Sequence, residues 1–479
     1  MTADERVRRQ LPWLVAVALF MENLDATIVN TAAPTMAASL GVEPLSLKGV
    51  LTSYTLALAV FIPVSGWAAD RFGTKRIFEW AVLVFSAGSL LCGIAVNLPM
   101  LVASRLLQGM GGAMMTPVGR LALVRAFPRS EMITVMNFVL IPALIGPLLG
   151  PVAGGLIVHW FHWRTIFFIN LPLGLFGYWL ARRTMPDFRD DETTPLDWRG
   201  FVLFGSGILL LSYVLEVLGD HSLPYVVALQ LGLCAVALLG LYLVHARRIP
   251  APILDLAIWR TRTFRISVGG GFITRLGVGG MPFLLPLLYQ VGFGYAPWQA
   301  GLLTMPAAAA AIVMKIVSKP LLARYGHRRV LRVNTVVMGV LIMTFGLVGP
   351  GTPIPAILLL SFMQGLASST QFTSMNSLVY ADVSDDDASK ASSIASTGQQ
   401  LAWSFGVALA SVVAQMFLQG VPQSDQPAFI GAMHQSFVTL GLITIVSSLT
   451  FSGLRPADGS NVSRHQYKPP MEQYGEKTA

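Results

Sequence analysis

Apolar segments of about 20 residues recur along almost the whole chain, and they constrain its fold more than any other feature. A helix needs about 20 mainly apolar residues to cross a bilayer, and about fourteen segments meet that criterion. Charged residues make up only 12% of the chain, against roughly 25% in soluble domains. The sequence therefore predicts an all-α membrane protein of about fourteen transmembrane helices, at residues 11–33, 47–69, 77–96, 99–122, 132–157, 163–181, 198–217, 224–245, 265–290, 297–318, 330–349, 354–380, 392–418 and 430–454.

The basic residues between these segments indicate how the chain is oriented. If the N-terminus is cytoplasmic, almost every Lys and Arg outside the spans is cytoplasmic too, and only Lys48 and Arg164 lie on the other side. This asymmetry predicts that both termini are cytoplasmic and that the number of spans is even. The net charge is +9, but it is spread over short loops in a lipid-embedded chain, so we expect no nucleic acid partner.

A repeat in the loops divides the chain into two halves. Residues 71–76 after the second span resemble residues 324–329 after the tenth, and Gln108 in the fourth span corresponds to Gln364 in the twelfth. An interval of eight spans predicts two six-helix bundles with two helices inserted between them, and a substrate site at the interface of the bundles. The expected divisions are residues 1–190 for the first bundle, 191–250 for the inserted pair, 251–454 for the second bundle and 455–479 for a disordered cytoplasmic tail.

Two acidic residues, Glu22 and Asp25, stand inside the first apolar segment. An ionised side chain at the bilayer centre costs about 2.5 to 3.5 kcal/mol, so such residues mark an ion, proton or substrate path unless a basic neighbour merely neutralises them. Their spacing of three places both on one helical face. Arg105 in the fourth span keeps its proton at any working pH and is the natural partner of either acid. We expect Asp25, Glu22 and Arg105 to couple protons; whether Glu22 or Asp25 is the main carrier, and whether Arg105 only stabilises the bundle, stays open.

Several motifs resemble those of the major facilitator superfamily. Residues 66–76 resemble its cytoplasmic loop signature, residues 105–113 its fourth-span motif and residues 146–155 its antiporter motif. Residues 24–34 and 163–174 look like signatures of the fourteen-span drug:proton antiporter branch, and the resemblance extends over nearly the whole chain. Two departures are Glu22, where an uncharged residue is expected, and Ala323, which stands where the first repeat has Asp70.

The resemblance implies a major facilitator fold, a monomer and a multi-pass protein of the bacterial cytoplasmic (inner) membrane. It also implies a conformational latch, in which Gly66 allows helices to approach, and a kinked fifth helix that rocks against its partner because prolines remove backbone hydrogen bonds. The latch residues are Gly66, Asp70, Arg71, Gly73, Lys75 and Arg76, and the residues of the kinked helix are Gly146, Pro147, Gly150, Pro151, Gly154 and Gly155.

Polar and aromatic residues within the spans are candidates for a substrate cavity, although each could equally serve helix packing. Arg105, Arg275 and Lys315 together could form a basic cavity suited to an anion, or Lys315 could extend to the membrane surface while Arg275 pairs locally. The candidates are Asn30, Tyr54, Gln108, Asn137, Tyr213, Arg275, Tyr289, Lys315, Gln364 and Gln371.

No motif for nucleotide hydrolysis or metal binding is present, and Cys92 and Cys234 stand alone in separate spans. We therefore expect no enzyme activity, no cofactor and no metal, and a proton gradient as the energy source. The predicted function is a proton-coupled secondary active exporter, an antiporter of drugs or other small amphipathic molecules that works by alternating access. The alternatives are an exporter of an anionic metabolite or metal chelate and, more remotely, a transporter-like sensor or passive pore.

Overall fold

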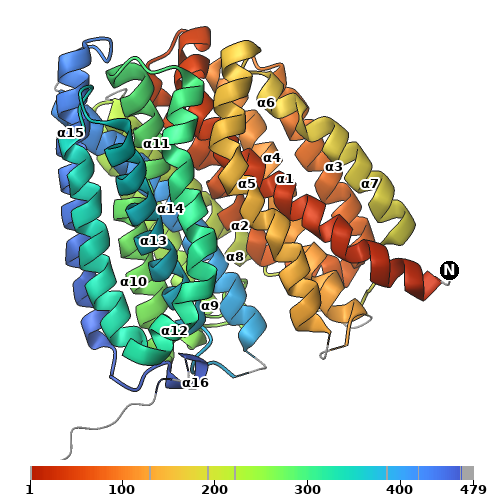
Figure 1. Ribbon diagram of the computed structural model, residues 1–479. Helices are drawn as coiled ribbons and strands as arrows, with labels where there is room; N and C mark the ends of the chain where they lie inside the picture. The colour runs from red at the N-terminus through yellow and green to blue at the C-terminus, as the bar shows by residue number, and fades with distance from the viewer. Residues whose placement is uncertain are drawn as a thin grey trace, which may run out of the picture.

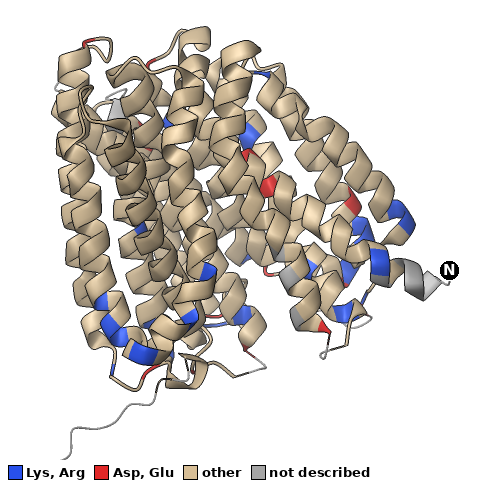
Figure 2. Cartoon of the chain, viewed as in Figure 1, with Lys and Arg blue, Asp and Glu red and all other residues tan. Residues whose placement is uncertain are grey.

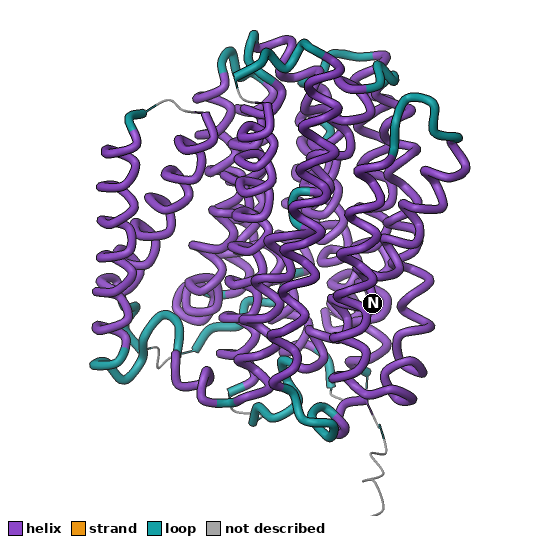
Figure 3. Tube along the Cα trace, turned by 90° about the vertical axis from the view of Figure 1, so that its left-hand side faces the viewer, coloured by secondary structure: helices purple, strands orange, loops and turns teal. Residues whose placement is uncertain are grey.

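The computed structural model describes residues 3–128, 131–190, 194–220, 223–384, 387–418, 420–463 and 465. Throughout these residues the regular structure is helical, and the trace in Figure 3 shows long helices joined by loops at the two ends of the molecule. The first half contains α1 (Ala3–Leu40), η1 (Pro44–Leu47), α2 (Lys48–Phe72), α3 (Thr74–Gly93), α4 (Leu98–Ala126), α5 (Met132–Trp160), α6 (Thr165–Phe168) and α7 (Asn170–Thr184). The two helices predicted to be inserted correspond to α8 (Trp198–Asp220) and α9 (Tyr225–Ala246).

The second half begins with a short 3-10 helix and ends with a short helix that follows the last long one. It contains η2 (Leu256–Arg260), α10 (Arg262–Val278), α11 (Met281–Leu287), η3 (Leu288–Gly292), α12 (Pro297–Thr344), η4 (Phe345–Leu347), α13 (Ile354–Leu378), α14 (Ala388–Leu418), α15 (Gln426–Ser447), η5 (Ser448–Gly453) and α16 (Ser460–Ser463). Within the predicted disordered tail, α16 is helical and Asp458 accepts a hydrogen bond from Arg262 at 2.5 Å. The rest of that tail lies outside the described residues.

Every predicted span coincides with helix, but some helices are divided differently from the prediction. The sixth span is two short helices, and the tenth and eleventh are one element, α12, which bends at Gly326 with φ 70°. Within the described residues, ten helices are long and apolar enough to cross a membrane. The count of fourteen spans and the cytoplasmic position of the termini therefore stay predictions.

The two halves lie side by side and meet along two seams. Figure 1 shows the first half in red to yellow and the second half in green to blue. At one seam α5 packs against α12, and at the other α2 packs against α14. The inserted helices α8 and α9 pack on each other, and α8 also contacts α2 and α14. Both seams thus join a helix of one half to a helix of the other.

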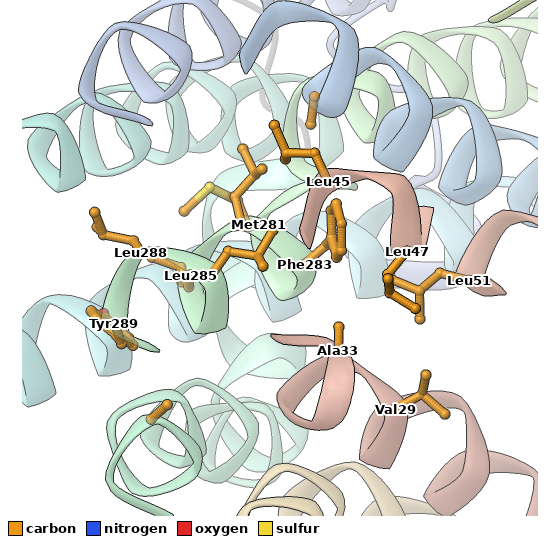
Figure 4. Close-up of a cluster of buried hydrophobic side chains, with 14 of the residues drawn as sticks. Val29, Ala33, Leu45, Leu47, Leu51, Met281, Phe283, Leu285, Leu288 and Tyr289 are labelled. Carbon is orange, nitrogen blue, oxygen red and sulfur yellow. The ribbon is translucent and has the colours of Figure 1, made fainter. Parts of the chain in front are cut away.

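The apolar cores show at which end of the molecule the two halves pack against each other. At the end of the molecule that carries the α1–α2 and α14–α15 connections, which we call the distal end, one core contains buried residues from both halves. Figure 4 labels members of this core from α1, η1 and α2 and from α11 and η3. At the opposite end, the terminal end, where α16 lies, the largest core of the first half and the small core around Leu331 and Phe451 are separate. Apart from a core that includes the inserted pair, the halves are therefore joined at the distal end.

Candidate functional site

A buried carboxylate with three hydrogen-bond donors lies inside the first half. The Asp25 side chain on α1 accepts a hydrogen bond from Arg105 Nη1 at 2.5 Å, from Gln108 Nε2 at 2.8 Å and from Asn170 Nδ2 at 2.7 Å. The donors come from α4 and α7, and the Arg105 and Asp25 side chains are both fully buried. A charge removed from water needs this kind of compensation, because an unpaired buried ion costs several kcal/mol. The arrangement therefore ties α1 to α4 and α7 through one carboxylate.

Arg105 is held from several directions at once. Its Nη1 also donates to Gln108 Oε1 at 2.7 Å, and its Nε donates to the Val50 carbonyl of α2 at 3.2 Å. The guanidinium carbon lies 4.2 Å from the centre of the Tyr54 ring, a distance at which a cation and an aromatic face attract. Arg105, Gln108 and Tyr54, which the sequence analysis singled out separately, thus belong to a single cluster around Asp25.

Two members of this cluster were missed by sequence reasoning. Ser89 on α3 accepts hydrogen bonds from Gln108 Nε2 at 2.6 Å and from Asn170 Nδ2 at 3.0 Å. Asn170 stands within the recognised stretch 163–174, so its place in that motif could have marked it. Ser89 is a small polar residue in an apolar span, and nothing in its neighbourhood in the sequence distinguishes it.

Glu22 lies on the same helix as Asp25 but has different surroundings. It is half-buried and accepts a hydrogen bond from the Thr116 hydroxyl of α4. None of the three donors to Asp25 also bonds Glu22 among the hydrogen bonds of the described residues. The structure therefore separates the two acids, which sequence spacing placed on one face, into two chemical environments.

The glycines of α5 pack directly on the turns of α1 that carry Asp25. A Cβ added at Gly146 would lie 2.9 Å from the Leu24 nitrogen, and one at Gly154 would lie 2.5 Å from the Ile28 carbonyl oxygen. On its other side α5 meets the second half, where Gly155 contacts Pro297 at the start of α12. Only glycine permits backbones to approach this closely. The fifth helix is therefore wedged between the helix of the acid and the other half.

The predicted latch residues form contacts within the first half. Asp70 pairs with Arg125 at 2.8 Å, and Arg125 also pairs with Asp190 at 3.1 Å. Gly73 has φ 96°, in the left-handed region that favours glycine, and Lys75 Nζ donates to the Arg182 carbonyl at 2.8 Å. Sequence reasoning missed Arg125 and Asp190, which lie far from Asp70 in the chain.

The other three latch residues, Gly66, Arg71 and Arg76, do not make the contacts expected of a latch in this structure. Arg71 and Arg76 are exposed. A Cβ at Gly66 would meet no described heavy atom within 4 Å, so the close helix approach expected at this glycine is not present. The turn at Gly73 and the ion pair of Asp70 are thus the parts of the motif that the structure explains.

Several cavity candidates of the second half are bound to near neighbours. Gln371 Nε2 donates to Thr335 at 2.7 Å and its Oε1 accepts from Asn334 at 2.9 Å, while Gln364 donates to Ser368 at 2.9 Å. These bonds join α13 to α12 or stay within α13. Gln371 thus serves helix packing in this conformation.

The remaining candidates are scattered. Arg275 is buried and donates to Gln399 Oε1 at 3.3 Å, whereas Lys315 is exposed on α12. Tyr213 lies on the inserted α8 and is 49% exposed. The structure therefore does not gather Arg105, Arg275 and Lys315 into one basic cluster. Of the others, Tyr289 is buried, Asn30 is half-buried, and the side chain of Asn137 lies outside the described residues.

A model of the Major Facilitator Superfamily matches this chain over residues 15–407 and again over residues 267–470. The chain belongs to the major facilitator superfamily. It is a membrane transporter, and the family indicates transport in place of enzymatic chemistry. The predicted superfamily is thus confirmed.

Relatives of similar length indicate which kind of transporter within the superfamily this chain resembles. A protein of Citrobacter koseri named "Putative multidrug resistance protein MdtD" is 38% identical over 92% of this chain and 93% of its own length. A Klebsiella pneumoniae protein with the same name is 39% identical over 95% of this chain and 96% of its own length. The predicted resemblance to drug transporters of this superfamily is therefore confirmed.

Solved structures with low identity share the fold of this superfamily member. A bacterial homologue of the human lysosomal transporter Spinster, in an inward-facing and unoccupied conformation, aligns with TM-score 0.68 and 14% identity over 97% of this chain and 99% of that chain. A D-xylose-proton symporter aligns with TM-score 0.64 and 12% identity over 95% of this chain and 99% of that chain. At these identities the likeness concerns the fold alone.

Proposed function

We propose that this protein is a proton-coupled antiporter that exports small amphipathic molecules, drugs among them, across the bacterial cytoplasmic membrane. The observation that carries the proposal is the fully buried Asp25 carboxylate, bound by Arg105, Gln108 and Asn170 and packed beside the glycine-rich α5. The names of the relatives as multidrug resistance proteins support drugs as cargo. The protein works as a monomer without a cofactor.

Protonation of Asp25 links the proton to the movement of helices. A neutral carboxyl no longer attracts the Arg105 guanidinium as an ion does, so α1 is freed from α4. Because α5 packs on α1 and also on α12 of the other half, a shift of α1 is passed to the seam between the halves. Each proton that moves inward down a potential of 100 mV supplies about 2.3 kcal/mol for this cycle.

The distribution of charge and of apolar core supports an orientation. Figure 2 shows most Lys and Arg at the lower end of the view, where α16 lies, which by the positive-inside rule favours a cytoplasmic terminal end. The distal core that joins the halves would then close the outer side, so this conformation faces inward. Proton release from Asp25 belongs to this state and proton uptake to the outward-facing one.

The test is proton flux in proteoliposomes that hold a pH gradient and an internal pH-sensitive dye. Lipophilic cations added to the parent protein should release protons from the gradient, and Asp25→Asn should abolish the response while the protein stays monodisperse. Glu22→Gln is the matched control and should retain the response, because Glu22 lies one turn away from Asp25 and its hydrogen bond among the described residues is to Thr116 and not to the donors of Asp25. Undiminished coupled export by Asp25→Asn would remove Asp25 from the mechanism.

A second candidate, export of an anionic metabolite or metal chelate, is favoured by one observation. Arg275 is buried, its Nε has no hydrogen-bond partner in the described part of the chain, and its one side-chain bond is to a neutral amide. Addition of organic anions or chelates to the same proteoliposomes distinguishes the two cargoes. An anion exporter should lose its response in Arg275→Gln, whereas a cation exporter should not.

A further inference from the structure

A cavity of about 700 Å³ opens at the terminal end of the second half, away from the Asp25 cluster. It lies between the part of α12 that follows the bend at Gly326 and the region of η5. The residues that matter for its chemistry are Arg328, Arg329, Arg332, Val333, Val336 and Val337. Basic and apolar side chains of one helix, α12, thus line the same cavity.

The three arginines have no acidic partner in the described part of the chain. Among the described residues no ion pair includes Arg328, Arg329 or Arg332, and Arg328 Nε is buried without a hydrogen-bond partner. Arg328 is half-buried, Arg329 and Arg332 are exposed, and all three line the cavity, where the forked donors of a guanidinium match phosphate oxygens. The described residues that line the cavity therefore supply no negative charge to these arginines.

The two repeats differ at the position of Asp70. In the first half the corresponding loop has Asp70, which pairs with Arg125. In the second half Ala323 stands in its place, and only its backbone carbonyl is engaged, by His465 Nδ1 at 2.8 Å. The second loop thus has basic residues, as the first loop does, but no acid at the position of Asp70.

The valines extend the cavity along the helix toward the middle of the molecule. Val333, Val336 and Val337 are 56%, 40% and 44% exposed, and their spacing places them on one helical face directly beyond the arginines. In a helix that crosses a bilayer, such a face contacts hydrocarbon. A cation cluster followed by an exposed apolar face matches a molecule with an anionic head and a long apolar tail.

We propose that this cavity binds an anionic phospholipid, with the phosphate at Arg328, Arg329 and Arg332 and an acyl chain along Val333, Val336 and Val337. Basic pockets between transmembrane helices on the cytoplasmic side are suited to anionic headgroups. A soluble phosphate would use the arginines but would leave the valines without a role. The lipid is held outside the transport path and does not depend on what the protein exports.

The experiment is a lipid titration of the purified full-length protein in detergent, followed by native mass spectrometry. Phosphatidylglycerol should bind with an affinity at least tenfold above that of phosphatidylcholine of the same chain length. The triple variant Arg328→Gln/Arg329→Gln/Arg332→Gln should weaken phosphatidylglycerol binding on the order of 100-fold, since each basic residue near an anionic surface contributes about a factor of five to ten. The control Arg199→Gln/Arg247→Gln/Arg248→Gln removes three exposed charges outside the cavity and should bind as the parent does.

Two further arms separate a lipid from a free anion. Val333→Asn/Val337→Asn should weaken phosphatidylglycerol binding, and inorganic phosphate at millimolar concentration should not displace the lipid from the parent protein. If the arginine variant does not fold, the comparison of the two lipids on the parent protein still decides. Equal binding of both lipids, unchanged binding by the arginine variant, or full displacement by inorganic phosphate would each overturn the proposal.

Discussion

The two halves of this transporter share a repeat, but equivalent positions inside them differ in charge. In the first half Arg105 and Asp25 form a fully buried ion pair. In the second half Ser361 stands at the position of Arg105, and the amide of Gln364 binds the neighbouring Ser368. At these equivalent positions one half therefore has neutral hydrogen bonds and the other has a charge pair.

The equivalent loops at the terminal end also differ in charge. Asp70 at the end of α2 pairs with Arg125 of α4, whereas the equivalent residue of the second half is the uncharged Ala323. The proposed lipid site therefore lies in the half that has no acid at this position.

The largest effect expected from this comparison follows removal of the buried guanidinium. Arg105→Ala leaves the Asp25 charge buried with only neutral donors, and the free energy of unfolding should fall by about 3–5 kcal/mol. The counterpart Ser361→Ala removes a neutral hydroxyl and should cost less than about 1 kcal/mol. Unfolding by dodecyl sulfate in mixed micelles measures both. The double variant Asp25→Asn/Arg105→Gln removes both charges and should be more stable than Arg105→Ala; an equally unstable double variant would contradict the ion-pair explanation.

A middle-sized effect is expected at the helix that carries the antiporter motif. Gly154→Ala would place a methyl group 2.5 Å from the Ile28 carbonyl, which is backbone and cannot turn aside, so a loss of about 1–3 kcal/mol and slower transport should follow. Its matched control in the second half is Gly398→Ala, whose nearest neighbour is a Val268 methyl at 3.4 Å and whose stability should change by less than about 0.5 kcal/mol. The same unfolding titration, with drug efflux from proteoliposomes, checks both variants. Similar behaviour of the two would show that the close packing of α5 on α1 is unimportant.

The smallest effect is expected at the latch. Arg125→Gln separates Asp70 and Asp190 from their common cation, and because all three side chains are a quarter or more exposed, the loss of stability should be only about 0.2–1 kcal/mol. The exposed Arg76→Gln serves as its control. Addition of 1 M salt should reduce the difference between the two variants, because salt screens exposed charges. A difference that salt leaves unchanged would mean that the pair acts through packing and not through charge.

Much of the helix layout could be predicted because a span is a local property of the chain. Each of the fourteen predicted segments coincides with helix, although ten helices of the described residues are long and apolar enough to cross a membrane. The repeat of residues 71–76 at 324–329 indicated two related halves. The same local signals could not predict that α12 continues past Gly326 as a bent element. They also could not divide the sixth span at Ile169, since these features depend on how neighbouring helices pack.

The candidate site was predictable only in part. Asp25, Arg105 and Gln108 were found because charged or amide side chains are rare inside apolar spans. Ser89 and Thr116 were not, since a hydroxyl in a membrane helix carries no distinctive signal until a partner is placed opposite it. Lys315 and Tyr213 were included for the same chemical reason as Arg105, but the structure leaves them exposed.

By itself, the sequence determined that this protein lies in a membrane, which family it resembles and that its first helix carries acids that need partners. Those properties follow from composition and spacing along one helix. The tertiary structure decided which acid receives the arginine, which basic residue pairs with Asp70 and where the halves close, because these depend on side chains that lie far apart in the chain. A buried charge is tolerated only where such distant partners converge, and that convergence is not recorded in any single segment.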